Sequence, residues 1–328
     1  MKTNKRHVFC PCMVALFFFV AGVVAAGAEM KSASLRPQWV PQAQFAGYYA
    51  ALAKGFYREA GIDLEIRPAG PGISALNNVA SGRETFASEW LISGITLAAK
   101  GAPVVNIAQM LQTSGLMLVS FKDTGINHPK QLDGKTVGIW PGAFSLAPTV
   151  LFEQFEIHPK LASQQFSINE FLSRKLEVVS AMIYNEYHTI LETGIKPTDV
   201  NTISFRDYGL NFPEDGIYVH RETLRKDPEL CRNFIKASIR GWLYAFEHPE
   251  EAVSIIMNAA TEAKTGTTRE HQATMLAEIK KMMLFRVGTE KIGELDPKDF
   301  AFVQDTLLKY KMSNKPLDFN DFHQPMHR

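Results

Sequence analysis

The first part of the chain alternates short apolar runs with runs of helical period, and this order constrains the fold more than any other feature. The predicted strands cover residues 33–40, 62–68, 84–90, 103–111 and 115–121. The predicted helices between them cover residues 46–61, 73–82 and 91–101, each closed by a glycine. Strands that alternate with helices in this way predict an α/β fold with a largely parallel sheet and helices on both faces.

A second block of alternating strands and helices predicts a second, smaller lobe. Its predicted strands are residues 136–140, 175–184 and 200–205, and its predicted helices are residues 141–155 and 185–194. Four helical runs then cover residues 229–249, 250–260, 269–285 and 299–310. We therefore expect lobe one to comprise residues 29–121 plus 215–328 and lobe two to comprise residues 122–214. Two crossings between the lobes would form a hinge beside a cleft.

The first 28 residues have the pattern of a secretory signal peptide. Lys2, Lys5 and Arg6 precede an apolar run at residues 14–26, and the small residues 26–28 fit a cleavage site. The apolar run is shorter than the roughly 20 residues that span a bilayer. Cleavage is therefore favoured over an uncleaved membrane anchor, and the pattern predicts export to the periplasm.

The composition of the chain after this segment limits which compartment and which partners can be expected. Cys231 is the only cysteine after residue 28, so neither an internal disulfide nor a cysteine-rich metal site is expected. An exported chain without disulfides suits a bacterial periplasm. Removal of residues 1–28 takes away three positive charges and changes the formal net charge from +1 to +1 − 3 = −2. This balance gives no electrostatic basis for binding nucleic acid or anionic lipid, and we expect a monomer.

Unusual residues gather at four predicted strand ends, which is where open α/β sheets place their ligand crevice. These ends supply three of the four tryptophans, together with amide groups and two carboxylates. Aromatic faces with a few polar groups are typical of a pocket for a small molecule, here a planar heteroaromatic. The candidate ligand-binding residues are Trp39, Gln42, Phe45, Glu89, Trp90, Trp140, Gly142, Tyr184, Asn185, Glu186 and Tyr187.

These residues also have structural interpretations. In that alternative Trp39 caps the core, Glu89 pairs with a surface lysine and Glu186 only complements a helix dipole. The polar neighbours of Trp39 favour ligand contact, whereas the two interpretations of Glu89 are evenly balanced. Residues 140–145 combine a glycine turn with a helix start and Ser145, which is a weak signal for an anion site.

The sequence carries no motif of a serine hydrolase, a zinc protease or a phosphate-binding loop. Its histidines are scattered, and no pair has the spacing of metal ligands. His271 stands alone on a predicted helix, and we expect it to be a solvated surface residue. The chain is therefore predicted to bind without catalysis and to need neither a metal nor a cofactor.

Several segments resemble one known family along nearly all of residues 33–313. They include "LRPQWVPQAQFAGYYAALAKGFYREAGIDLEI", "SGRETFASEW", "QLDGKTVGIW", "MIYNEYHTILETG" and "EDGIYVHRETL". In this order they look like the thiamine-pyrimidine and sulfonate type of periplasmic solute-binding proteins. The resemblance implies a type II periplasmic binding fold, with two lobes around a cleft and a hinge. It also implies that the protein feeds an ABC transporter, with a membrane permease as partner.

The resemblance favours one class of ligand. Family members that bind pyrimidine precursors carry a tryptophan after the first strand and an Asn/Tyr/Glu cluster in lobe two, to which Trp39 and residues 184–187 are similar. This similarity implies a thiamine pyrimidine precursor or a similar heteroaromatic. A taurine or other sulfonate ligand is the alternative, although Glu89 and Glu186 would repel an anion. A sensing role in place of transport stays open.

The same family contains an enzyme, the thiamine pyrimidine synthase. That enzyme uses a lysine that carries pyridoxal phosphate, a nearby histidine and a CCCFC iron-binding motif. The resemblance puts Leu91 at the lysine position, Ile95 at the histidine position and the cysteine-free residues 209–216 at the motif. A Schiff base needs an amine, and iron binding at such a motif needs cysteine thiolates. The enzyme is therefore the disfavoured alternative.

Overall fold

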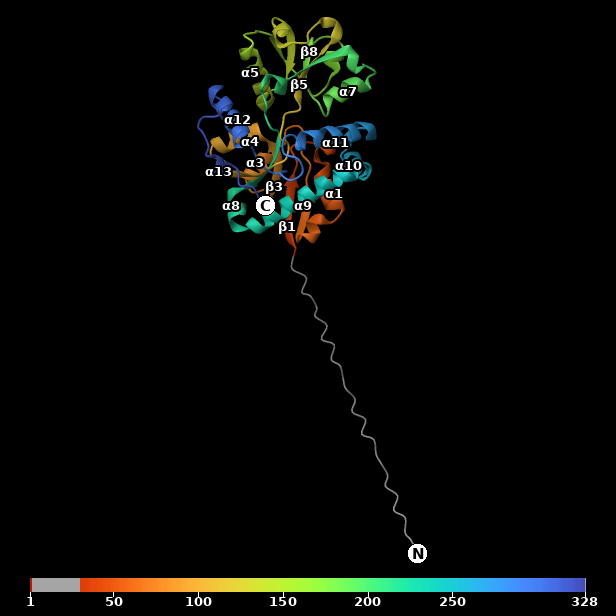
Figure 1. Ribbon diagram of the computed structural model, residues 1–328, viewed down its shortest axis with the longest axis vertical. Coiled ribbons are helices and arrows are strands. Elements are labelled where there is room, and N and C mark those ends of the chain that lie inside the picture. The colour runs from red at the N-terminus through yellow and green to blue at the C-terminus, as the bar shows by residue number, and fades with distance from the viewer. Residues whose placement is uncertain (2–29, 328) are drawn as a thin grey trace.

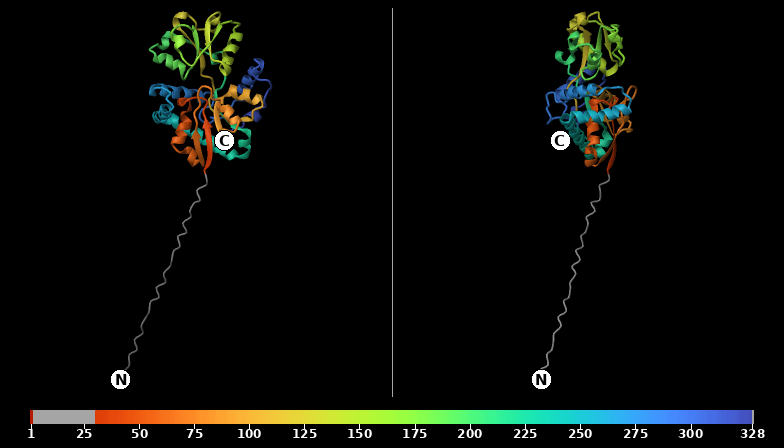
Figure 2. Two further views of the ribbon diagram at one scale, coloured as in Figure 1. Left: turned by 180° about the vertical axis from the view of Figure 1, so that it is seen from behind. Right: turned by 90° about the vertical axis from the view of Figure 1, so that its right-hand side faces the viewer.

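The computed structural model describes residue 1 and residues 30–327, so the predicted signal peptide lies outside the described residues apart from Met1. The chain builds two five-stranded sheets, which lie one above the other along the long axis of the molecule (Figure 1). We call the part built on the first sheet lobe one and the part built on the second sheet lobe two. Lobe one is the larger and holds the C-terminus (Figure 2).

The first sheet has the strand order β2-β1-β3-β10-β4. Its strands are β1 (Lys31–Arg36), β2 (Ile62–Ile66), β3 (Phe86–Trp90), β4 (Val104–Gln109) and β10 (Asp215–His220). β1 is parallel to β2 and β3, whereas β10 is antiparallel to its neighbours β3 and β4. The expected largely parallel sheet is thus mixed. β10 enters from lobe two, at the edge where β3 ends, so it runs the opposite way.

The second sheet has the order β7-β6-β8-β5-β9. Its strands are β5 (Leu116–Phe121), β6 (Thr136–Ile139), β7 (Lys160–Ser163), β8 (Val178–Met182) and β9 (Val200–Ser204). β5 was expected in lobe one, but it pairs antiparallel with β8 and β9. Its residues are apolar apart from Ser120 and buried apart from Phe121, and this pattern fits either sheet equally well. The crossing into lobe two therefore comes before β5, not after it.

Helices cover both faces of the first sheet (Figure 1). On one side α1 (Ala46–Ala53) packs against α9 (Pro228–Glu247) and α10 (Pro249–Glu262). On the other side α4 (Leu91–Ala99) packs against α12 (Pro297–Lys309). The remaining helices are α2 (Phe56–Glu59), α3 (Ala75–Ala80), α5 (Leu146–Gln154), α6 (Asn169–Leu172), α7 (Glu186–Glu192), α8 (Arg221–Lys226), α11 (Arg269–Met283) and α13 (Phe319–Phe322). Within residues 30–327, none of these helices is long and apolar enough to cross a bilayer.

The contact of α1 with α9 depends on two glycines. A Cβ added at Gly241 would overlap the carbonyl oxygen of Gly47 and lie 2.6 Å from the Cβ of Ala51. A Cβ added at Gly47 would overlap the indole ring of Trp242. The two helices can therefore approach closely only because both positions lack a side chain. This contact fixes the first helix of lobe one beneath the loop that carries Trp39.

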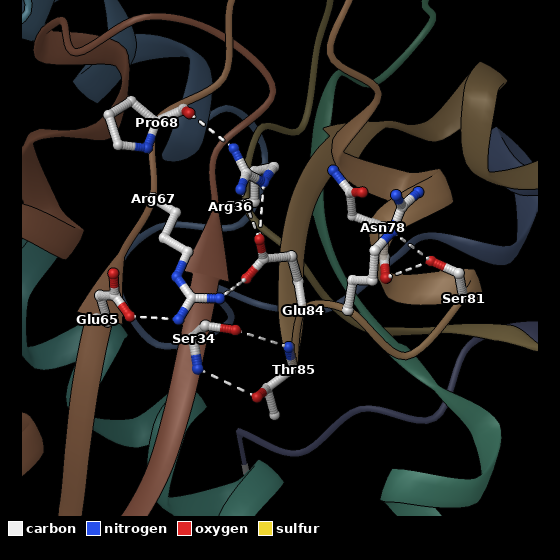
Figure 3. Close-up of polar contacts among 10 residues, drawn as sticks. Ser34, Arg36, Glu65, Arg67, Pro68, Asn78, Ser81, Glu84 and Thr85 are labelled. Carbon is white, nitrogen blue, oxygen red and sulfur yellow. Dashed lines mark hydrogen bonds and ion pairs between the residues drawn. The ribbon is translucent and has the colours of Figure 1, made fainter.

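An ion-pair network holds the ends of the first strands in place (Figure 3). Nε and Nη2 of Arg36 donate to Oε1 of the buried Glu84 at 2.9 and 2.6 Å, and Nη1 donates to the carbonyl oxygen of Pro68 at 2.8 Å. Arg67 donates to the other oxygen of Glu84 at 3.3 Å. Two arginines that share one buried carboxylate make directional, charge-assisted bonds. The network fixes the end of β1, after which the chain enters the loop of Trp39.

Candidate functional site

A cavity of about 160 Å³ lies between the two lobes, at the strand ends that the sequence singled out. Trp39 follows β1, Trp90 ends β3, Trp140 follows β6 and Tyr184 follows β8. We call this cavity the aromatic chamber. The residues that line it are Trp39, Gln42, Gln44, Trp90, Trp140, Phe144, Phe166, Met182, Tyr184, Asn185 and Glu186.

Most of the predicted site residues meet in this chamber. Those that line it are Trp39, Gln42, Trp90, Trp140, Tyr184, Asn185 and Glu186. Phe45 does not, because it is fully buried in the core of lobe one. Tyr187 packs against the core of lobe two, since it is the neighbour of Glu186 on α7 and lies about 100° further round the helix.

Glu89 and Gly142 line a different cavity. Successive residues of a strand point to opposite faces of the sheet, so Glu89 faces away from the aromatic chamber that its neighbour Trp90 lines. Its carboxylate accepts a hydrogen bond from the Trp90 backbone N–H at 3.1 Å. Burial raises the pKa of Glu89 to about 8. Among the described residues, Glu89 forms no ion pair with a lysine, and it does not line the same cavity as Glu186.

Aromatic rings of both lobes meet across the aromatic chamber. Trp39 of lobe one lies 4.9 Å from Phe166 of lobe two, between ring centroids. Trp90 of lobe one makes an edge-to-face contact with Phe144 of lobe two, with centroids 4.5 Å apart. Such tilted and edge-to-face geometries are favourable for aromatic pairs. The walls of the chamber therefore come from both lobes.

Phe166 was not identified from the sequence. The Trp140 indole Nε1 donates to the carbonyl oxygen of Gln165 at 3.2 Å, and this bond positions the loop that carries Phe166. Phe166 is 60% exposed, although it is a large apolar residue. The sequence pattern that could have indicated Phe166 is a phenylalanine within the mostly polar segment of residues 163–169. Its position over Trp39 is visible only once the lobes are in place.

The polar edge of the chamber centres on Glu186, the first residue of α7. Oε2 of Glu186 accepts from the Met182 backbone N–H at 3.0 Å, and Oε1 accepts from the Asn185 amide at 2.8 Å. Burial raises the pKa of Glu186. A carboxyl group in such surroundings can both accept and, when protonated, donate a hydrogen bond.

A chain of buried amides supports the floor of the chamber. The Gln42 amide donates to Gln44 at 2.6 Å, and the Gln44 amide donates to Oδ2 of Asp215 at 2.9 Å. Gln38 donates to the other oxygen of Asp215 at 2.5 Å and accepts from the Ser88 hydroxyl. Burial raises the pKa of Asp215 to about 7, although both glutamines act to lower it. The network orients Gln42 and Gln44 toward the chamber.

Glu214 lies where the chain returns from lobe two to lobe one. Its carboxylate connects this crossing both to the first crossing, from lobe one to lobe two, and to lobe two itself. Its carboxylate accepts from the Gly115 N–H at 2.6 Å, from the Ser114 hydroxyl at 3.2 Å and from the Tyr184 hydroxyl at 3.2 Å. Burial raises the pKa of Glu214 to about 8. The hydroxyl of Tyr184 is thus held by the hinge, while its ring lines the chamber.

A second cavity of about 320 Å³ adjoins the first and shares Trp39, Gln42 and Asn185 with it. We call it the threonine chamber, because Thr189, Thr265, Thr267 and Thr268 line it together with Glu192, His271 and Gln272.

His271 was expected on the surface but is buried between the lobes. Its Nδ1 lies 2.8 Å from Oε1 of Glu192, and its Nε2 lies 2.9 Å from Oδ1 of Asn185. The expectation was wrong because α7 of lobe two packs against α11 across the cleft, and the sequence pattern of α11 alone does not show this contact.

The segment predicted as a weak anion site forms a short 3-10 turn, Gly142–Ser145, before α5. The Ser145 hydroxyl donates to the carbonyl oxygen of Gly142 at 2.8 Å. The hydroxyl therefore closes its own turn.

The positions that correspond to the synthase machinery do not fit that chemistry. Leu91 and Ile95 are both fully buried in α4 and pack in the core of lobe one. Neither can form a Schiff base, which needs an amine. Within the described part of the chain, no group of three or more histidine, cysteine, aspartate or glutamate side chains is placed to hold a metal ion.

Comparisons with known proteins agree with this architecture. The riboflavin-binding protein RibY of Chloroflexus aurantiacus is 24% identical over 72% of this chain and 69% of its own. The formylaminopyrimidine-binding protein of Halalkalibacterium halodurans is 23% identical over 75% of this chain and 76% of its own. A 4-amino-5-hydroxymethyl-2-methylpyrimidine phosphate synthase of Legionella pneumophila is 27% identical over 64% of this chain and 68% of its own.

Solved structures share the fold. The periplasmic aliphatic sulphonate binding protein SsuA of Escherichia coli superposes with a TM-score of 0.70 at 12% identity, covering 89% of this chain and 91% of its own. The predicted two-lobed periplasmic binding protein fold is therefore confirmed. The sequence model described as "NMT1/THI5 like" matches residues 42–252. The chain belongs to the NMT1/THI5-like family.

Proposed function

We propose that the protein is the periplasmic substrate-binding component of an ABC importer and that its ligand is a thiamine pyrimidine precursor or a similar small heteroaromatic. The aromatic chamber carries this proposal. It combines aromatic walls from both lobes with a single carboxyl group, Glu186. Binding between two lobes gives a ligand the means to favour a closed form that a membrane permease can recognise.

The size of the chamber suits one aromatic ring. Its volume is about 160 Å³, and a cavity of about 150 Å³ is large enough to bind benzene. A six-membered ring with small substituents therefore fills it, whereas a fused three-ring system would have to extend beyond it. A pyrimidine ring therefore fits within this chamber alone, whereas a flavin would also have to occupy the adjoining cavity.

The chemistry of the polar edge suits an aminopyrimidine. A carboxyl group beside such a ring accepts from the amino group and, when protonated, donates to the adjacent ring nitrogen. Burial raises the pKa of Glu186, so a bound ring can share a proton with it more easily than with an exposed glutamate. In the described part of the chain, no lysine or arginine lines the chamber, so a sulfonate would meet a carboxyl group and no cation.

Two of the relatives support a heteroaromatic ligand, because they are named as binding proteins for riboflavin and for a formylaminopyrimidine. The second name supports a pyrimidine. We further propose export through the signal peptide predicted at residues 1–28 and a monomer as the working form. One structural relative, from Staphylococcus aureus, is described as the ligand binding component of an ABC-type import system, which supports a permease as partner.

Calorimetry of the exported protein tests the proposal. We expect micromolar binding of 4-amino-5-hydroxymethyl-2-methylpyrimidine and much weaker binding of taurine and riboflavin. Micromolar taurine binding without pyrimidine binding would refute the pyrimidine ligand.

A catalytic role is the other possibility that the relatives raise, since one of them is named as a synthase. We propose that this chain is not an enzyme, because Leu91 and Ile95 replace the lysine and histidine that the chemistry needs. Protein purified with added pyridoxal phosphate and then dialysed should show no visible absorbance band of an internal Schiff base. A stable band removed by borohydride would contradict the proposal.

A further inference from the structure

The threonine chamber opens beside the aromatic chamber, and the two share Trp39, Gln42 and Asn185. Its lining is of another kind. Threonine hydroxyls replace the aromatic rings, and its volume of about 320 Å³ is twice as large. A ligand ring in the aromatic chamber would therefore have room for a substituent in the threonine chamber.

The hydroxyl groups of this chamber have hydrogen-bonding capacity left over. Thr267 accepts from the Gln272 amide at 2.7 Å and Thr268 accepts from the His271 N–H at 3.1 Å, so each can still donate its hydrogen. Thr189 and Thr265 each donate to a backbone carbonyl oxygen at 3.3 Å, so each can still accept. The chamber thus offers donors and acceptors together.

The charged side chains of the chamber disfavour an anionic substituent. Among the described residues that line it, none is a lysine or an arginine. Glu192 contributes a carboxylate, and Oε1 of that carboxylate is 2.8 Å from Nδ1 of His271. A phosphate or sulfonate would therefore meet a carboxylate and no lysine or arginine side chain among these residues.

We propose that the threonine chamber binds a short, neutral, hydrogen-bonding arm, such as a hydroxyl or amide, on the heteroaromatic ring of the ligand. This inference rests on the proposed function, since it assigns the ring to the aromatic chamber. It goes further by assigning the arm to four threonines and by disfavouring the phosphorylated form of the ligand.

A matched series of ligands separates the two claims. Calorimetry compares 4-amino-2,5-dimethylpyrimidine, which has no polar arm, with the 5-hydroxymethyl compound, the 5-formylaminomethyl compound and the 5-hydroxymethyl phosphate ester. We expect both neutral arms to bind about tenfold more tightly than the dimethyl compound, and the phosphate ester to bind more weakly than its alcohol.

Variants of the chamber locate the arm. The double variant Thr189→Val and Thr265→Val removes two acceptors with little change in shape, and should lower affinity for the armed compounds about tenfold while leaving the dimethyl compound unaffected. Thr261→Val is the matched control, because Thr261 also donates to a helix carbonyl oxygen, that of Met257, but lines neither chamber.

Equal binding of the armed and unarmed compounds, or tightest binding of the phosphate ester, would refute the assignment of the arm to the threonine chamber. Neither result would refute a heteroaromatic ligand. An unchanged affinity of the double variant for the armed compounds would refute this assignment in the same way. Failure of every pyrimidine to bind would overturn the proposed function itself.

Discussion

Glu186 is the residue on which recognition of the ligand most depends. Among the described residues that line the aromatic chamber it provides the only carboxyl group. Two protein donors, the Met182 N–H and the Asn185 amide, already hold its oxygens. Its position is therefore set before a ligand arrives, which lowers the cost of ordering it on binding.

Replacement of Glu186 by glutamine should weaken aminopyrimidine binding. The variant cannot present a second acceptor or an acidic hydrogen to the ring edge, so we expect at least about a tenfold rise in Kd by calorimetry. Glu177→Gln is the matched control, because Glu177 also accepts from a backbone N–H, that of Thr136 at 2.9 Å, but lies outside the chamber. Equal loss in both variants would mean that lobe two, not recognition, had been damaged.

Three buried carboxyl groups should give the protein an unusual dependence of stability on pH. Burial raises the pKa to about 8 for Glu89 and Glu214 and to about 7 for Asp215. Unfolded carboxyl groups titrate near 4, so between pH of about 4 and 8 the folded state binds more protons than the unfolded state. Stability from these groups is therefore fully present below about pH 4 and is lost as pH rises through their folded pKa values.

The measurement is thermal unfolding of the ligand-free protein between pH 5 and 9. We expect the melting temperature to fall by about 5 °C or more across this range, and Glu89→Gln to flatten part of the decline. Glu65→Gln should leave the slope unchanged, because Arg67 lowers the pKa of the exposed Glu65 and its titration lies below this range. A melting temperature that rises steadily with pH would show that these groups are ionised at little cost.

Single residues also show how far sequence reasoning could reach into the site. Trp39, Trp140 and Glu186 were identified because each stands at the end of a predicted strand, where chain order alone brings residues to the cleft. Phe166 and His271 were not, because each gains its role from a neighbour in the other lobe. Pairings across the cleft depend on how the lobes meet, and no local pattern records this.

At the level of elements, the packing of α1 on α9 is the contact that tolerates least change. Two aromatic residues adjoin it, since Tyr48 and Trp242 meet edge to face with ring centroids 5.5 Å apart. Both are almost fully buried. Close packing leaves no space for the helices to shift.

Gly241→Ala should therefore destabilise the protein, although alanine favours helices. The added Cβ would overlap the carbonyl oxygen of Gly47, and overpacking of this kind costs about 1–3 kcal/mol. We expect urea unfolding to show a loss of that size. Gly70→Ala is the control, because its Cβ would meet only Val40 at 3.6 Å. A Gly241→Ala variant as stable as the parent would mean that the helices separate freely.

Elements were predicted well where their pattern is local and poorly where topology decides. β1, β2, β3 and β6 were found close to their predicted positions, because each is an apolar run next to a turn. β7 was missed, since this edge strand has no buried residue. β5 was found but assigned to the wrong lobe, because its apolar residues fit either sheet.

At the level of the whole molecule, contacts on opposite edges of the cleft hold the lobes together. On one edge His271 of lobe one meets Asn185 and Glu192 of lobe two. On the other edge Glu153 of α5 accepts from Lys309 at 2.7 Å and from the Tyr310 hydroxyl. The aromatic chamber lies between them, so a ligand and these contacts favour the same closed arrangement.

Glu153→Ala should lower ligand affinity without touching the ligand. Glu153 lines neither chamber, so the variant acts only on the balance between open and closed lobes. We expect a larger radius of gyration for the ligand-free variant in small-angle X-ray scattering and a roughly threefold rise in Kd.

Glu59→Ala is the control for Glu153→Ala, because Glu59 pairs with Arg240 on the surface of lobe one alone. A loss of affinity without a change in scattering would place the effect of Glu153 in the stability of α5. A change in scattering with unchanged affinity would show that the ligand binds to one lobe. If binding requires the lobes to close, Glu153→Ala should change both the scattering and the affinity, and Glu59→Ala should change neither.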